Sequence, residues 1–183
     1  MDHLLSRHSL GIKHLQAPGP SPAELEQMVA AALRAPDHAE LVPWRLCAVQ
    51  GGAREQLADL FVQHALAKGK SEVDRAMERE RALKAPLTVA VIARIDMGHP
   101  LVPAHEQWMA VGGAITNFLN AAHALGYAGK MLSGDKARAV PIAQAFCGAG
   151  ETLVGWIAIG TPAKALNARE RKSVQEVLGH WTA

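Results

Sequence analysis

The sequence predicts a fold of the α/β or α+β class, in which helices pack on a central sheet. Two observations lead to this class. Apolar residues at helical spacing alternate along the chain with short runs that are typical of strands. In addition, 183 residues with a hydrophobic content of 49% can bury one sizeable core, and no repeat or low-complexity linker divides them. We therefore expect a single domain over residues 1–183.

The first half of the chain contains three predicted helices and one strand. Ser21-Pro22-Ala23-Glu24 places a capping serine before a proline at the first helical position and an acid at the third, which predicts a helix over 21–34. After a proline-bearing loop, the segment 44–49 alternates as a strand does. Two further helices are predicted over 53–68 and 71–84, the second with a charged, solvated face.

The second half begins with an apolar run over 87–95, rich in valine and isoleucine, which predicts a buried central strand. Apolar residues then recur at helical spacing between Trp108 and Leu125, which predicts a long helix. Gly112 and Gly113 inside it cost stability, so we expect another helix, such as one from a second subunit, to approach them closely. The remaining predicted elements are a strand at 127–132, a helix at about 137–146, a strand at 152–159 and a basic tail from Thr161-Pro162.

Composition excludes several classes of function. A net charge of +2 with 20% charged residues gives no electrostatic footprint for nucleic acid or an acidic membrane. The sequence contains neither a signal peptide nor an apolar stretch long enough to span a bilayer, so we expect a cytoplasmic protein without nucleic-acid or membrane partners. Cys47 and Cys147 lack CxxC spacing and are expected to be buried free thiols. His105-Glu106 lacks the second histidine of a zinc helix, and no metal site is expected.

Polar clusters on predicted loops are the candidate functional residues. Each has an ordinary explanation, since arginines at helix ends complement the helix dipole and Ser-Gly pairs form turns. Together they supply the guanidinium and hydroxyl donors that a phosphate needs and a cation for a flavin ring. The clusters are Arg7-His8-Ser9, Arg34 with Asp37-His38, Ser133-Gly134 and Arg169–Lys172. From the residues alone, an anion site in an α/β domain is plausible but not required.

A family resemblance adds to this interpretation. Leu4–Ser9 and Arg34–His38, followed by Pro43-Trp44, resemble the two opening motifs of the nitroreductase family. The similarity continues through Ala114–Gly126, Ser133-Gly134 and 154–162, and so covers nearly the whole chain. The compact length and the Ala-Pro-Asp-His form are most similar to the YdjA-like branch of that family.

The resemblance implies an α+β sandwich with a central, mostly antiparallel sheet flanked by helices, and an intertwined homodimer with FMN at the subunit interface. It also implies an oxidoreductase that transfers hydride from NADH or NADPH through FMN to a nitroaromatic, quinone or similar acceptor. Because both substrates would use one exposed flavin face in turn, ping-pong kinetics are expected. No side-chain acid, base or nucleophile is required.

The motif match also assigns site residues. The FMN contacts implied by the resemblance are Arg7, His8, Ser9, Arg34, His38, Met131, Leu132 and Ser133. The stretch matched to the nicotinamide cofactor is Ala121, Ala122, His123, Ala124, Leu125 and Gly126. The tail cations that would hold the FMN phosphate are Arg169, Arg171 and Lys172.

Two departures from the family pattern bear on function. Met131 and Leu132 stand where relatives have Trp-Arg, which removes one cationic contact to the flavin, and Gly11 stands where many have a cation, with Lys13 slightly beyond. Three alternatives therefore remain open: a flavoenzyme of this fold with another acceptor, including oxygen; a catalytically silent module that binds or delivers flavin; and a structural interaction protein.

Overall fold

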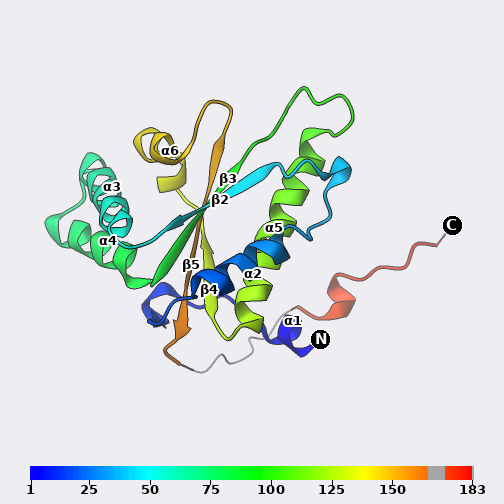
Figure 1. The fold of residues 1–183 in the computed structure, drawn as a ribbon, viewed down its shortest axis with the longest axis horizontal. Coiled ribbons are helices and arrows are strands. Elements are labelled where there is room, and N and C mark those ends of the chain that lie inside the picture. The colour runs from blue at the N-terminus through cyan, green and yellow to red at the C-terminus, as the bar shows by residue number, and fades with distance from the viewer. Residues whose placement is uncertain (165–171, 183) are drawn as a thin grey trace.

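A computed structural model describes residues 1–164 and 172–182 and contains a five-stranded sheet. The strands are β1 (Leu15–Gln16), β2 (Trp44–Val49), β3 (Leu87–Ala93), β4 (Ala128–Leu132) and β5 (Thr152–Pro162). β2, β3, β5 and β4 lie side by side in this order, β1 pairs with the end of β5, and each described pairing is antiparallel. The predicted central position of β3 and the mostly antiparallel sheet flanked by helices are confirmed (Figure 1).

Helices cover both faces of the sheet. They are α1 (Asp2–Ser6), α2 (Pro22–Ala32), α3 (Ala53–Ala67), α4 (Glu72–Lys84), α5 (Ala104–Ala124) and α6 (Val140–Phe146). Short 3₁₀ turns are η1 (Ile12–His14), η2 (His38–Glu40), η3 (Lys136–Arg138) and η4 (Val174–Glu176). Figure 1 shows α2 and α5 on one side of the sheet and α3, α4 and α6 on the other. Among the helices of the described residues, none is long and apolar enough to cross a membrane.

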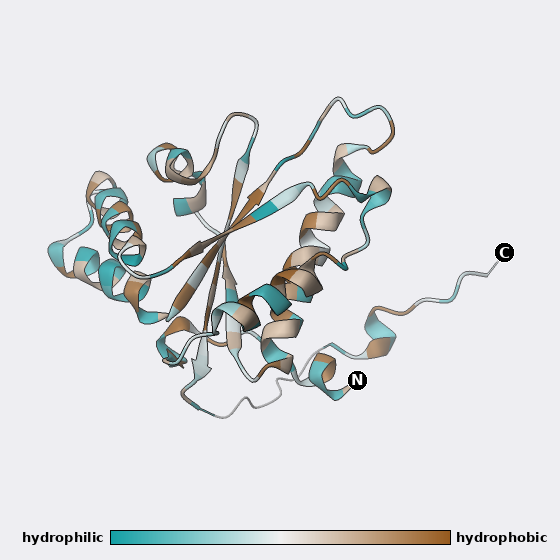
Figure 2. Cartoon of the chain, in the orientation of Figure 1, coloured by the Kyte–Doolittle hydropathy of each residue, from teal (hydrophilic) through white to brown (hydrophobic). Residues whose placement is uncertain are grey.

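The alternation of side chains along β3 explains why two cores form. Every residue of β3 is buried, and the strands are among the most apolar segments of the chain (Figure 2). Leu87, Val89 and Val91 pack toward α2 and α5, whereas Ala90 and Ile92 pack toward α3 and α6. Because successive side chains of a strand point to opposite faces, one apolar run holds both helical layers in place.

The start of α2 follows the predicted capping pattern. Ser21 Oγ accepts a hydrogen bond from the Glu24 amide at 3.3 Å, and the Ser21 amide donates to the Glu24 carboxylate at 2.8 Å. This reciprocal pair satisfies two of the amide groups that a helix leaves free at its N-terminus.

Two predicted boundaries were wrong. Thr161 and Pro162, expected to begin the tail, still belong to β5, because β1 supplies the backbone partner that continues the sheet. The helix expected from residue 137 begins only at Val140, after a separate 3₁₀ turn. Pro141 lies in the first turn of α6, where its missing amide breaks no hydrogen bond.

The two glycines of α5 have different surroundings. A methyl group on Gly113 would lie 3.1 Å from the Cβ atom of Ala35, so the predicted close approach exists. It comes from the turn after α2 of the same chain and not from a helix. Gly112 is exposed, and a methyl group there would meet none of the described atoms within 4 Å.

Candidate functional site

A cavity of about 280 Å³ lies between α3, α4 and the sheet, on the face away from α5. Its walls are mainly apolar, and they are formed by Leu57, Phe61, Ala82, Ala85, Leu132, Trp156 and Ala158. Charged residues stand at its rim, namely Glu78, Arg81, Asp135 and Lys136. An apolar pocket with a few polar groups is the usual form of a small-molecule site, and this volume suits a ring system better than a whole nucleotide.

Trp156 forms part of the cavity wall from the centre of the sheet. The rings of Phe61 and Phe146 pack edge-on against it, at centroid distances of 5.1 and 6.1 Å. The buried indole N–H of Trp156 has no hydrogen-bond partner among the described residues. Buried polar groups are almost always satisfied, so this donor is an exception among the buried groups of the described residues.

The end of β4 forms another wall because a glycine lets two strands approach closely. Gly155 of β5 has a φ of +148°, and a methyl group on it would lie 2.1 Å from the carbonyl oxygen of Leu132. Only glycine adopts this backbone conformation readily and leaves room for that carbonyl. The close approach fixes where β4 ends, and the next two residues, Ser133 and Gly134, line the cavity with Leu132.

Ion pairs connect the elements that form the rim of the cavity. Lys136 Nζ lies 2.7 Å from the Glu78 carboxylate and 5.0 Å from the centroid of the Phe61 ring. Asp135 lies 3.0 Å from His64 of α3, and the hydrogen bond from His64 lowers the pKa of Asp135. These contacts connect α3, α4 and the loop after β4 around the opening.

Arg81 is the rim cation with the greatest freedom. Its side chain is 62% exposed, and its described ion pair is a long one, 3.4 Å to Glu78 on the same helix. The guanidinium can therefore turn toward a ligand in the cavity at little cost.

The N-terminal motif Leu4–Ser9 does not itself line the cavity, but the chain reaches the cavity three residues after it. Ile12 lines the cavity wall, whereas Arg7, His8 and Ser9 precede it, with His8 only 8% exposed. Next to them, Ser6 Oγ lies 3.0 Å from His123 Nε2 at the end of α5. Burial, followed by the nearby charges of His3, Arg7 and His8, lowers the pKa of His123.

Arg34 and His38 lie on the α2 and α5 side of the sheet. Both are exposed, and His38 Nδ1 lies 2.6 Å from the Glu106 carboxylate in the first turn of α5. Neither residue lines the cavity within one chain. A single copy of the chain therefore does not bring the second opening motif, Arg34–His38, to the cavity.

The other predicted residues divide between the two faces. Leu132 and Ser133 line the cavity, but the side chain of Met131 packs in the opposite core, as alternation along β4 requires. Ala121–Gly126 also lies on that opposite side, where Ala122 is fully buried. Lys172 is exposed, and Arg169 and Arg171 fall outside the described residues.

The residues of α4 were missed by sequence reasoning. The charges of this helix indicated a solvated face, yet Glu78, Arg81 and Ala82 follow each other at helical spacing and all three face the cavity. Ala85, one turn beyond Arg81, extends the same face. The signal available in the sequence was that the small residues Ala82 and Ala85 lie at helical spacing from the charged residues Glu78 and Arg81.

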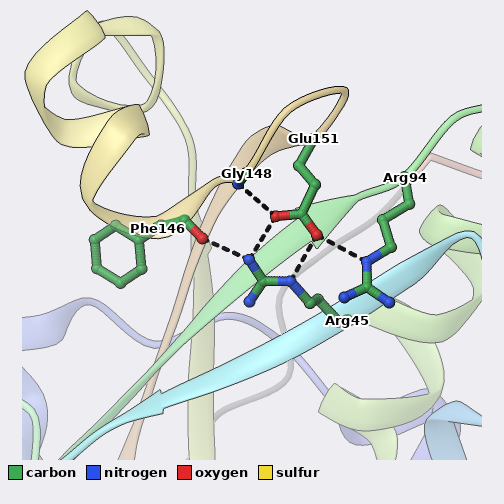
Figure 3. A network of polar contacts seen from close by, with 5 residues as sticks. All are labelled: Arg45, Arg94, Phe146, Gly148 and Glu151. Carbon is green, nitrogen blue, oxygen red and sulfur yellow. Dashed lines mark hydrogen bonds and ion pairs between the residues drawn. The ribbon is translucent and has the colours of Figure 1, made fainter.

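A second charged cluster has a structural explanation. Figure 3 shows the Glu151 carboxylate between Arg45 and Arg94, with nitrogen–oxygen distances of 2.6 to 2.8 Å. The amide of Gly148 donates to the same carboxylate at 2.8 Å, and Arg45 also donates to the carbonyl of Phe146. Arg45, then the Gly148 amide and Arg94, hold the pKa of Glu151 far below its usual range. Since each Glu151 oxygen is bonded, this network fastens β2 and β3 to the loop before β5.

The two cysteines border that network. Cys47 and Cys147 are free thiols, as expected, but both are only partly buried. Burial raises the pKa of Cys147, so its thiol stays protonated near neutral pH and is a weak nucleophile.

Comparison with known proteins gives consistent matches over most of the chain. The model of the Nitroreductase family matches residues 4–161. The chain is 32% identical over 165 residues to "Putative NAD(P)H nitroreductase YdjA" of Escherichia coli K12, covering 88% of this chain and 87% of that protein. It is 30% identical over 151 residues to "Putative NAD(P)H nitroreductase" of Haemophilus influenzae, covering 81% and 82%.

Solved structures share the fold. A nitroreductase-like protein from Bacillus cereus superposes with a TM-score of 0.81 at 21% identity, covering 100% of this chain and 95% of that one. A BluB-like flavoprotein from Clostridium difficile gives 0.75 at 22% identity, with coverage of 99% and 98%. An oxidoreductase containing FMN gives 0.70 at 22% identity, with coverage of 100% and 92%.

Proposed function

Because the chain belongs to the nitroreductase family, we propose that it is an FMN-dependent oxidoreductase that takes its reducing equivalents from NADH or NADPH. The names of its relatives in E. coli and H. influenzae, which refer to NAD(P)H nitroreductase, support the donor. A structural relative that contains FMN supports the proposal that FMN is the cofactor. In this chain, the observation that carries the proposal is the apolar cavity with a charged rim and the Ser133-Gly134 loop at its edge.

The cavity fits the ring system of FMN. Apolar walls that include Phe61, Trp156 and Ala158 suit an isoalloxazine, and the Ser133 segment supplies hydrogen-bonding groups at its polar edge. The ribityl phosphate would extend past Ile12 toward Arg7 and Ser9, where a guanidinium and a hydroxyl can hold a phosphate.

Arg81 supplies the cation that the Met131-Leu132 pair lacks. The side chain of residue 132 lines the cavity, so a leucine there leaves an apolar wall, while Arg81 stands on the rim. When bound, FMN would supply the redox chemistry, accepting a hydride from the nicotinamide and passing it to a nitroaromatic, quinone or similar acceptor. The Arg81 guanidinium would stabilise the negative charge of the reduced ring. Donor and acceptor would take turns on the exposed face of the flavin at the mouth of the cavity, and ping-pong kinetics are expected.

A homodimer would complete the site. Arg34 and His38 do not reach the cavity of their own chain, so a second copy must supply them if they contact FMN. Exposed apolar residues on α1 and α5 give this copy a surface to bury, namely Leu4, Leu5, Trp108 and Met109. Sedimentation analysis should therefore give twice the mass of the chain for the FMN-loaded protein.

The first test is an absorbance spectrum of the purified protein between about 300 and 550 nm, before and after anaerobic NADH or NADPH, because the flavin is the redox centre proposed. A flavin spectrum that bleaches supports the oxidoreductase. A flavin spectrum that stays unchanged with both donors would favour the silent module, and a protein that takes up no FMN would refute the proposal.

The second test is the Arg81→Ala variant, with Arg75→Ala on the same helix as its control. Removing the cation should slow reduction of the bound flavin by roughly tenfold or more, because a charge-assisted contact is worth about 1.5–3 kcal/mol. Arg81→Lys should restore part of the rate, since it keeps the charge. An Arg81→Ala variant that reduces its flavin as fast as the control would exclude this role.

A further inference from the structure

A side groove of about 200 Å³ adjoins the cavity at the end of α3. His64, Ala65, Lys68 and Lys70 form its wall on the α3 side. Its remaining lining residues, Glu78, Asp135 and Lys136, also belong to the rim of the cavity. The groove and the cavity are thus two parts of one continuous depression.

The charges of this groove do not cancel. Both acids that line it already have partners, since Glu78 pairs with Lys136 at 2.7 Å and Asp135 with His64 at 3.0 Å. Lys68 and Lys70 have no ion-pair partner within residues 1–164 and 172–182. With His64 neutral, Lys68, Lys70 and Lys136 stand against two acids, so the groove keeps a net positive charge next to the cavity.

The backbone directs Lys70 toward the groove. Gly69 has a φ of +69°, and the amide of Lys70 donates to the carbonyl of Ala65 at 3.0 Å. This is the hydrogen bond by which a glycine after a helix turns the chain back over the last helical turn. Lys68 and Lys70, two residues apart, consequently line the same hollow.

We infer that this side groove binds a phosphate of the nicotinamide dinucleotide while its redox ring lies against the flavin at the mouth of the cavity. The inference rests on the proposed function, because it requires the donor to bind above the flavin. A dinucleotide is far longer than the cavity, so its phosphates must leave across the rim. The shared rim residues lead to a hollow in which two ammonium groups lack carboxylate partners, and these can hold a phosphate group.

Steady-state kinetics of the FMN-loaded protein test this inference. The variants are Lys68→Glu, Lys70→Glu and the double variant, and Lys84→Glu, an exposed cation outside the groove, is the control. The donors are NADPH, NADH and N-benzyl-1,4-dihydronicotinamide, which carries the redox ring without any phosphate. The KM for NADPH should rise roughly two- to fivefold for each lysine and about tenfold for both. The rate with the benzyl donor should equal that of the control.

The comparison of donors identifies the phosphate. A rise in KM for NADPH alone would show that the groove binds the 2′-phosphate. An equal rise in KM for NADH would show that it binds the pyrophosphate, and both results support the inference. An unchanged KM for both dinucleotides overturns it, and a lower melting temperature with unchanged KM would show that the lysines only complement the α3 dipole. A wild-type flavin that no donor reduces would refute the proposed function, and the inference with it.

Discussion

Replacing Gly155 by alanine tests whether one close approach between strands shapes the cavity. The methyl group would lie 2.1 Å from the Leu132 carbonyl oxygen. An ordinary carbon–oxygen contact is about 3.3 Å, so the end of β4 must move by about 1.2 Å or the strain must remain. Because Leu132, Ser133 and Gly134 line the cavity, the shift would displace a wall of the proposed flavin site.

The expected loss of stability has two parts. An L-residue in a backbone region reserved for glycine costs about 1–3 kcal/mol, and overpacking costs about 1–3 kcal/mol more. The free energy of unfolding should therefore fall by about 2–6 kcal/mol. For a chain of this size, the melting temperature would drop by roughly 5–20 °C.

Thermal unfolding followed by circular dichroism measures the loss of stability. Titration with FMN, at a temperature where the variant is folded, measures the effect of the displaced wall on flavin binding. Gly52→Ala is the matched control, since Gly52 has a φ of −64° and a methyl group there meets none of the described atoms within 4 Å. If Gly155→Ala melts within 2 °C or so of the control and binds FMN equally well, the close approach does not shape the site.

Two further predictions concern stability alone. Glu151→Gln should lower the melting temperature at neutral pH, because Arg45, the Gly148 amide and Arg94 lower the pKa of the carboxyl group from its ordinary 4.5. The stabilisation from the ionised Glu151 carboxylate is complete above the unfolded pKa and is lost as the pH falls. The difference in melting temperature between wild type and Glu151→Gln should therefore narrow between about pH 5 and pH 3 and not widen. Ser21→Ala removes the cap of α2 and should lower the free energy of unfolding by about 1 kcal/mol. This corresponds to roughly 2–4 °C in melting temperature, and FMN affinity should not change. A larger change in affinity than in stability would contradict a purely structural role.

Local patterns predicted the elements well because their signals lie within a few residues. The cap at Ser21, the apolar run of β3 and the helical spacing of α5 each depend on neighbours in sequence, and the predicted elements are present. The family, the fold and the enzyme class implied by the motifs are likewise confirmed. The end of β5 was misjudged because its partner, β1, lies more than a hundred residues away.

The cavity was harder to predict because its walls come from four separate parts of the chain. Ile12, the α3–α4 pair, the end of β4 and Trp156 meet only through the antiparallel pairing of β3, β4 and β5. Motifs near the N-terminus identified the residues before Ile12, but nothing local showed that charged α4 lies over a cavity. A charged residue looks the same in sequence whether it faces bulk water or a binding site.

The division of the motifs between the two faces of the sheet also bears on assembly. Leu132 and Ser133 line the cavity on the α3 and α4 face, whereas Arg34 and His38 lie on the α2 and α5 face of the same chain. A sheet separates the two sets, so no rotation of a side chain can bring them to one ligand. If both sets bind FMN, they must come from different copies, and the subunit interface must pass along the cavity. Substitutions at Arg34 should then impair the site of the partner subunit, and mixing Arg34→Ala chains with Arg81→Ala chains should yield heterodimers with one intact site in two. Mixed dimers without any recovered activity would show that Arg34 and Arg81 serve the site of the same chain, and a fully active Arg34→Ala homodimer would place Arg34 outside the flavin site.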